Sequence, residues 1–160
     1  MTLGALIDLG ADKNAFLTEL EKLHLEGYEI AFETTQRNAI TATHVNVILT
    51  GQEQAHDHTH IHEHIHDHGH THEHDHEHSH DHERGHFHRS FRDIRQMIQN
   101  SELSKEVKDL SLRIFTRVAR AEAKVHHKDM EEVQFHEVGA VDSIVDIVGS
   151  AILITMLKPD

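Results

Sequence analysis

The sequence predicts a small mixed helix and strand domain, of the α/β class with α+β as the alternative, interrupted by a disordered histidine-rich insertion. Three observations predict it. Apolar residues recur at helical spacing on both sides of the insertion, and they alternate with polar residues in two segments between positions 28 and 49. Between positions 52 and 89 they almost disappear. We therefore divide the 160 residues into 1–51, an N-terminal helix and strand part, 52–89, the insertion, and 90–160, a mostly helical part.

The first part is predicted as two helices followed by two strands. Gly10 is placed to end the first helix, Asp12 to begin the second and Gly27 to end it. Two segments with a period of two then predict strands, with residues 34–39 as their connection. The apolar residues that define these periods are Leu3, Leu6, Ile7 and Leu9, then Phe16, Leu17, Leu20 and Leu23, then Tyr28, Ile30 and Phe32, and finally Val45, Val47 and Leu49.

The third part is predicted as helical, with one short strand. Ser90 and Asp93 have the spacing of a capping box that begins a first helix. A longer helix is expected from about residue 104 to 125, residues 133–135 alternate as a strand does, and residues 140–157 form a mostly buried helix after a glycine. The apolar face of the longer helix is expected to consist of Val107, Leu110, Ile114, Val118 and Ala121.

Composition and charge exclude several classes of protein. The chain has no cysteine, which excludes disulfides and thiolate metal sites, and its formal charge of −13 argues against nucleic acid as a partner. The opening MTLGALIDLGAD lacks the basic region and long apolar core of a signal peptide. The one candidate for a membrane span, residues 138–157, contains Asp142 and Asp146, which are costly in lipid. We therefore expect a cytoplasmic protein with no membrane partner.

Histidines occupy every second position through most of the insertion. In an extended chain, alternate side chains fall on the same side about 6.6–7 Å apart, so neighbouring imidazoles can turn onto one ion. Imidazole suits nickel, zinc, copper and iron, and at four to six ligands per ion the segment has capacity for about three or four ions. The predicted metal ligands, called here the histidine tract, are His56, His58, His60, His62, His64, His66, His68, His70, His72, His74, His76, His78, His80, His82, His86 and His88.

Acidic residues interleave with these histidines. Residues 56–83 contain eight Asp or Glu and no Lys or Arg, so the segment attracts cations. Imidazole must be neutral to ligate a metal, and its ordinary pKa is about 6.5, which predicts strong binding at about pH 7.5 and loss near pH 5. A purification tag or a plain solvated linker fits less well, because tags are terminal and contiguous and linkers favour Ser, Gly, Glu and Lys.

A second candidate site lies in the segment EEVQFHEVGAVDSIVDIVG at residues 131–149. His136 and Glu137 follow the expected short strand, and Asp142 and Asp146 lie four residues apart on one face of the next helix. These four residues are the candidates for holding a cation or a phosphate-bound metal, and thus for catalysis. A structural role is an equal alternative, because an acid favours a helix N-terminus and a histidine is often a hydrogen-bonded core residue. The histidines at 126–127 are expected to be exposed after a helix.

The same segment carries a family resemblance. FHEVGAVDSIVDIVG at 135–149 closely resembles a signature of the LarC family of nickel insertion proteins. ARAEAKVH at 119–126 and HFHRSFRDIRQMI at 86–98 are similar to two further family blocks, and MTLGALIDLGAD is similar to the family's start. A histidine-rich insertion between these blocks is also typical, so the resemblance spans nearly the whole chain.

The resemblance implies a function and its cofactors. LarC-like proteins insert Ni²⁺ into pyridinium-3,5-bisthiocarboxylic acid mononucleotide, a pincer-shaped precursor, to form the nickel-pincer nucleotide cofactor of lactate racemase. They use CTP with Mg²⁺ or Mn²⁺. The implied enzyme class is a nickel chelatase of the lyase type, and the implied partners are the precursor, a C-terminal LarC portion and a lactate racemase-type apoenzyme. A homo-oligomer is left open.

The chain departs from the family pattern at both ends. Family members usually begin with a strand and a loop resembling DAFSGISGDM, and Met1 matches the last residue of that loop. They also continue well beyond the position of Asp160, through the part linked to CTP. We therefore expect an N-terminal fragment that keeps nickel capture, and we leave open whether it is active alone.

Two other functions compete with nickel insertion. A non-catalytic nickel or zinc chaperone or store needs only the histidine tract, and it predicts that His136 and Asp142 are dispensable. A cytoplasmic loop of a zinc transporter would also carry alternating His and Asp, but it requires apolar spans that this chain lacks. Nickel insertion is preferred because it accounts for both the tract and the signature.

Overall fold

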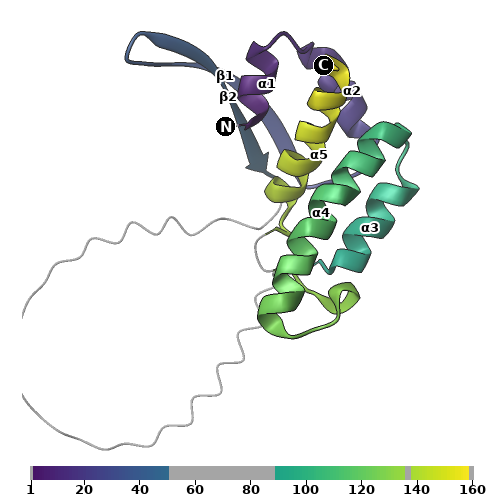
Figure 1. Ribbon diagram of the computed structural model, residues 1–160. Helices are drawn as coiled ribbons and strands as arrows, with labels where there is room; N and C mark the ends of the chain where they lie inside the picture. Colours follow the sequence, from purple (N-terminus) through teal and green to yellow (C-terminus); the bar gives the residue numbers. More distant parts are fainter. Residues whose placement is uncertain (1, 51–88, 136–137, 159–160) are drawn as a thin grey trace, which may run out of the picture.

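The computed structural model describes residues 2–50, 89–135 and 138–158, and Figure 1 shows their arrangement. The predicted disorder of the insertion lies outside the described residues, and so does His88 at its end. Five helices and one two-stranded antiparallel sheet are described. The mixed helix and strand class is thus confirmed, and the antiparallel sheet corresponds to its α+β form. In order, the elements are α1 (Thr2–Asp8), α2 (Lys13–Glu21), β1 (Tyr28–Arg37), β2 (Ile40–Leu49), α3 (Phe91–Asn100), α4 (Lys105–His126), the short 3₁₀ turn η1 (Met130–Glu132) and α5 (Val141–Leu157).

Helix α5 is the centre of the core. It packs against α1, α2, α4 and β2 (Figure 1), and most of its first thirteen residues are buried. Gly149 lets α1 and α2 approach, because a Cβ there would lie 3.1 Å from Leu3 Cδ2 and 3.3 Å from the Phe16 ring. The prediction of a mostly buried helix is confirmed. No helix in the described ranges has the length and apolar content needed to cross a membrane.

The helix starts follow the predicted capping chemistry. The Asp12 carboxylate accepts a hydrogen bond from Ala15 N at 2.7 Å at the start of α2. Ser90 and Asp93 form the predicted capping box before α3, with both reciprocal bonds present. The predicted end of α2 at Gly27 is wrong, because the helix stops at Glu21 and the chain turns through His24 at φ 55°.

The hairpin is longer than predicted. Residues 34–37 belong to β1 rather than to the connection, and the turn consists of Asn38 and Ala39 alone, with φ of 48° and 64°. Positive φ at both central residues is the type I′ turn that matches the twist of a hairpin. The apolar alternation ends at Phe32, but the threonines that follow favour strands through β-branching. The outer half of the hairpin therefore extends away from the helices, as Figure 1 shows.

Helix α1 is packed against the outer edge of β2. The Asp8 carboxylate accepts a hydrogen bond from Thr43 N at 2.8 Å. One turn earlier, Gly4 comes so close that an added Cβ would lie 2.0 Å from Thr43 O. These contacts cover the exposed backbone groups of an edge strand and join the hairpin to the helical body.

The predicted apolar face of α4 is only partly confirmed, because Leu110 and Val118 are partly buried against the core and Ala121 is exposed. Val107 is buried as expected, but the other fully buried positions are Ser111, Phe115 and Ala119. The ring of Phe115 enters the core beside Phe135, with ring centroids 6.3 Å apart. The most buried line of α4 therefore runs through Phe115, to one side of the line through Leu110, Ile114 and Val118.

Candidate metal-handling site

A short backbone pairing joins the residues after the histidine tract to those before His136. Phe91 N donates to Val133 O at 3.0 Å, and Phe135 N donates to Arg89 O at 3.2 Å. The predicted strand at 133–135 is thus reduced to one isolated antiparallel bridge, between Ser90 and Gln134. The pairing brings Arg89, which directly follows the tract in sequence, next to Phe135, which directly precedes His136.

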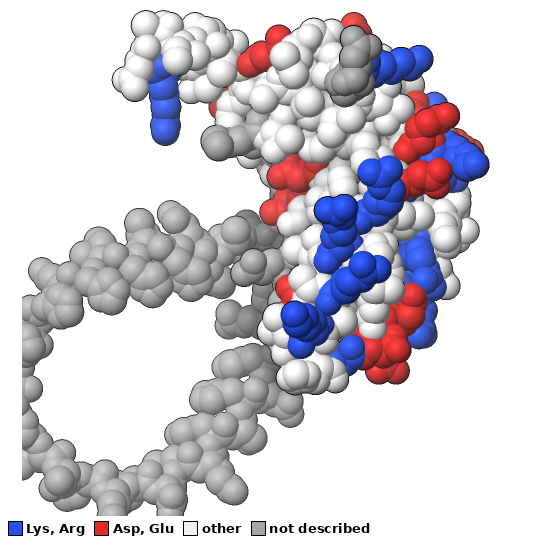
Figure 2. Space-filling view, viewed as in Figure 1, with Lys and Arg blue, Asp and Glu red and all other residues white. Residues whose placement is uncertain are grey.

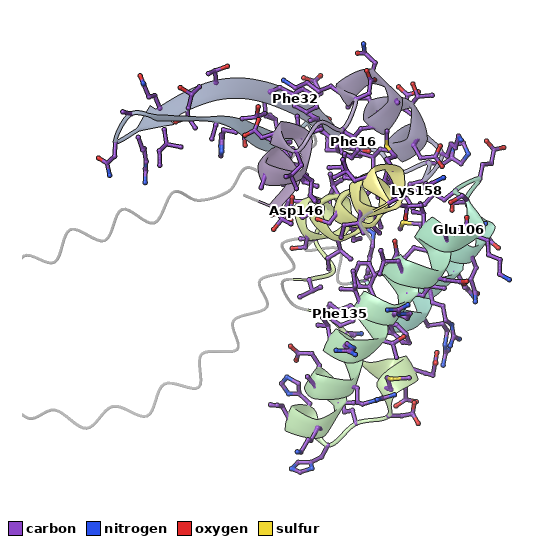
Figure 3. All side chains as sticks on the ribbon, turned by 45° about the horizontal axis from the view of Figure 1, so that its top comes forward. Phe16, Phe32, Glu106, Phe135, Asp146 and Lys158 are labelled. Carbon is purple, nitrogen blue, oxygen red and sulfur yellow. The ribbon has the colours of Figure 1, made fainter. Side chains whose placement is uncertain are left out.

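Aromatic and glycine packing hold this pairing in place. The Phe135 ring is buried and meets the Phe91 ring edge-on, with centroids 6.4 Å apart. Figure 3 shows Phe135 between α4 and the start of α5. Gly139 is equally tightly packed, because a Cβ there would lie 3.0 Å from Phe135 O and 3.1 Å from Arg89 O. Arg89 Nη1 also donates to Gly139 O at 3.1 Å. The chain is therefore fixed on both sides of residues 136–137.

The acidic pair lies on α5 as predicted. Asp142 is exposed in the first turn, and its Oδ1 accepts a hydrogen bond from Ser143 N at 2.8 Å. Asp146 follows one turn later (Figure 3), and although the residue is exposed overall, desolvation of its carboxyl group raises the pKa. The neighbouring Asp142 carboxylate raises it further. Two nearby carboxylates of this kind favour a cation between or beside them.

The other predicted site residues lie outside the described residues. These are the histidine tract and the two residues His136 and Glu137. Within the ranges that the structure describes, no three His, Asp or Glu side chains are grouped closely enough to hold a metal ion. Of the candidate site residues, the structure therefore describes only Asp142 and Asp146, which lie on α5. It also describes the residues that flank His136 and Glu137.

The described residues include two histidine–glutamate contacts that the sequence analysis missed. His126 and His127 are exposed as expected, but His126 is the last residue of α4 and its Nε2 lies 3.2 Å from Glu122 Oε2. The spacing of four residues was the signal that could have identified the pair. His24 and Glu102 form a second, longer contact of 3.8 Å between Nε2 and Oε2.

In the part of the chain that the structure describes, two of the cavities have a histidine in their lining. One of about 60 Å³ is lined by His126, Lys128, Val133 and Gln134, directly beside the pairing that precedes His136. A larger groove of about 650 Å³ lies between α1 and the hairpin, lined by residues including Asp8, Glu33, Arg37 and His44. The larger groove is on the hairpin rather than beside Phe135, so the small cavity is the more relevant to metal handling.

Positive charge is concentrated on one surface of the helical part. Ten of the chain's 15 Lys and Arg lie between Arg89 and Lys128, and Figure 2 shows a line of them along the exposed face of α4. Arg113, Arg117, Arg120 and Lys124 recur at spacings of four, three and four residues, which puts them on one side of the helix. A divalent cation is repelled from this side, so a metal site on α4 must lie elsewhere on the helix.

Comparison with known proteins gives a match over the whole chain. Residues 1–160 match the family model described as nickel insertion protein. The chain is 46% identical over 160 residues to a pyridinium-3,5-bisthiocarboxylic acid mononucleotide nickel insertion protein of Acetivibrio thermocellus, covering all of this chain and 33% of that relative. It is 53% identical over 169 residues to a protein of the same name from Clostridium acetobutylicum, with 38% of the relative covered.

A similarly named protein of Akkermansia muciniphila is 42% identical over 164 residues, with 34% of its length covered. The chain thus spans about a third of the length of the curated relatives it matches. No solved structure matches it significantly.

Proposed function

The chain belongs to the nickel insertion protein family, and from that premise we propose that it captures Ni²⁺ and directs it to pyridinium-3,5-bisthiocarboxylic acid mononucleotide, the compound named for its relatives. Nickel is here the substrate that is moved, and the nickel-pincer nucleotide is the product. The relatives are about three times as long, so the complete reaction is assigned to this chain together with the further part found in those proteins.

The observation that carries the proposal is the pairing between Arg89 and Phe135. It brings Arg89, the residue that follows the histidine tract in sequence, next to Phe135, the residue that precedes His136. A tract that gathers ions is most useful if it ends where the ions are needed, since a tethered donor raises the local concentration at a nearby site. The buried Phe135 ring and the close packing of Gly139 make this a fixed junction rather than a chance approach.

The chemistry of transfer follows from ligand preference. Neutral imidazoles bind Ni²⁺, and many equivalent imidazoles rebind an ion before it escapes. His136, Glu137, Asp142 and Asp146 are the candidates that receive it on the folded domain, because carboxylates and imidazoles are ligands that Ni²⁺ accepts. The thiocarboxylate sulfurs of the precursor are softer ligands than imidazole and carboxylate, so transfer to them is favourable.

The family resemblance implies CTP with Mg²⁺ or Mn²⁺ for the complete protein, and we do not assign a CTP site to the segment that leads into α5. Gly139 precedes α5, but its backbone is packed against Phe135 and Arg89 and is not an open phosphate-binding loop. Asp142 in the first turn of α5 would also repel a phosphate. We therefore derive no step through CTP in this chain. The remaining proposals are delivery of the product to a lactate racemase-type apoenzyme and a cytoplasmic location.

Nickel calorimetry on the full chain tests capture. At about pH 7.5 we expect about three or four ions to bind, and near pH 5 we expect the heat to disappear because the imidazoles are protonated. A full-length variant with Asn at all sixteen tract positions is the control and should lose most of this capacity. An unmodified chain that takes up no nickel at the higher pH would refute capture.

An insertion assay tests the transfer. The chain is combined with a polypeptide covering the rest of a relative, CTP, Ni²⁺ and the metal-free precursor, and nickel incorporation is followed spectroscopically. We expect the Asn variant to require more nickel yet to reach the same yield when nickel is saturating. Full incorporation by a His136→Ala, Asp142→Asn double variant would favour the alternative, a chaperone or store that only supplies nickel.

A further inference from the structure

We propose that Glu122 and His126 form a two-ligand chelate for a divalent transition-metal ion at the end of α4, distinct from the histidine tract and the acidic pair of α5. The proposal extends the proposed function by naming a site on the folded domain that holds the ion. It rests on that function only in taking nickel as the ion, whereas the chelate itself is argued from geometry.

The separation of the two ligand atoms fits a chelate. Glu122 Oε2 and His126 Nε2 are 3.2 Å apart. Bonds of about 2.05 Å from each atom to one ion would enclose an angle of about 100°, between the octahedral and the tetrahedral angle. Carboxylate oxygen and imidazole nitrogen are ligands that nickel and zinc accept. The two atoms are therefore already at a chelating distance, and binding requires that Nε2 of His126 carry no proton.

The pair lies on a side of α4 that a cation can approach. An α-helix turns about 100° per residue, so Glu122 and His126 project away from the line of Arg113, Arg117, Arg120 and Lys124. Both side chains keep access to solvent, with 36% of Glu122 and 48% of His126 exposed. Burial is thus low enough for an ion to enter and high enough to limit the motion of the two side chains.

The surroundings connect this chelate to the candidate site. His126 lines the cavity of about 60 Å³ that Val133 and Gln134 also line, so one of the two ligands borders this space. Residues 133–135, which include Val133 and Gln134, pair with residues 89–91. A nickel ion bound to His126 would lie near the pairing of residues 89–91 with residues 133–135. Lys128 lines the cavity as well, and its ammonium group opposes a divalent ion.

The pair of His24 and Glu102 is a matched control within the same chain. It is also a histidine and a glutamate, but its Nε2 and Oε2 are 3.8 Å apart and more exposed, at 66% and 74%. At bonds of about 2.05 Å, a shared ion would need an angle of about 135°, which neither common geometry offers. The two residues also come from separate segments, so no helix holds their spacing.

Nickel titration of the full-length chain with Asn at all sixteen tract positions tests the proposal. Binding is measured by calorimetry and located by the paramagnetic broadening of amide signals in NMR spectra, which we expect to centre on α4 near residues 122–126. His126→Ala and Glu122→Gln should each weaken binding about tenfold or more. The double variant should be little worse than either single one, because a chelate fails when one arm is lost. Lys128→Met should strengthen binding several-fold.

The control variant is His24→Ala, which should change nickel affinity less than twofold. Circular dichroism should show that every variant keeps its helix content. Unchanged affinity in His126→Ala, or broadening centred away from α4, overturns the chelate. If instead the chelate binds nickel while the unmodified chain fails in the insertion assay, the proposed function fails and the chelate stands.

Discussion

The helical body around α5 and the hairpin of β1 and β2 are stabilised by different interactions. Helix α5 is buried among α1, α2 and α4, and several of its side chains have no exposed surface. The outer half of the hairpin is exposed, and it depends on strand pairing and on α1 at the edge of β2. The candidate metal site lies on the α5 side. The comparison therefore predicts that the hairpin can be weakened without loss of nickel handling, whereas α5 cannot.

The largest expected effect is a cavity in the body. Ile152 on α5 is fully buried, so Ile152→Ala should lower the free energy of unfolding by about 2–5 kcal/mol. Chemical denaturation monitored by circular dichroism measures it. Ile40→Ala at the hairpin turn is the control, because 71% of Ile40 is exposed and a change within about 0.5 kcal/mol is expected. Equal losses in both variants would contradict the comparison.

The next effect concerns the contact between the two regions. Gly4→Ala places a Cβ 2.0 Å from Thr43 O, so α1 or β2 must shift at a cost of about 1–3 kcal/mol. Gly10→Ala is the matched control for this clash. Gly10 has a strained φ of 108°, but an added Cβ there would have no atom within 4 Å. If nickel affinity fell with Gly4→Ala at a temperature where the body stays folded, the independence of the two regions would be disproved.

A smaller and favourable effect is expected at the hairpin turn. Ala39 adopts φ of 64°, a left-handed conformation that glycine accepts without a Cβ penalty. Ala39→Gly creates the Asn-Gly pair preferred in type I′ turns and should stabilise the hairpin by about 0.5–1 kcal/mol. Slower amide hydrogen exchange in β1 and β2, with no change in α5, is the expected result.

The smallest effect is the pH dependence of the α1 contact. Hydrogen bonds from Thr43 hold the pKa of Asp8 below its ordinary value of 3.8. The contribution is therefore complete above that value and is lost as the pH falls through the lowered pKa. The melting temperature of Asp8→Asn should lie slightly below that of the unmodified chain at pH 7. The gap should close in strongly acidic solution, and a constant gap would mean that the carboxylate charge is irrelevant.

Much of the helical framework was predictable from local patterns. The capping residues Asp12 and Ser90 and the apolar run of α5 gave correct helix starts and a correct buried helix, because these signals lie within a few residues of each other. The burial of α4 was predicted only in part because Phe115 packs against Phe135, a residue twenty positions away, and no local period contains that contact. The length of the hairpin was underestimated because its outer half is exposed on both faces and so has no apolar alternation.

The candidate site was predictable only in part. The sequence shows that Asp142 and Asp146 share a helix face, since this needs only the period of a helix. That Arg89 pairs with Phe135 depends on tertiary packing and has no signal in either segment alone. The contact of Glu122 with His126 was predictable from the same four-residue spacing, because both residues belong to α4 and an exposed histidine can still contact a glutamate one turn earlier.

The backbone bonds at Thr50 and Arg89 have a consequence for how much metal such a protein can carry. Thr50 N bonds to Gly27 O and Phe135 N bonds to Arg89 O, so both borders of residues 51–88 are set by contacts outside that stretch. The entropy of closing a chain segment rises only with the logarithm of its length, about 0.6 kcal/mol for each doubling. Extra His-Asp or His-Glu repeats could therefore be gained or lost at little thermodynamic penalty, and ion capacity could evolve almost independently of the fold.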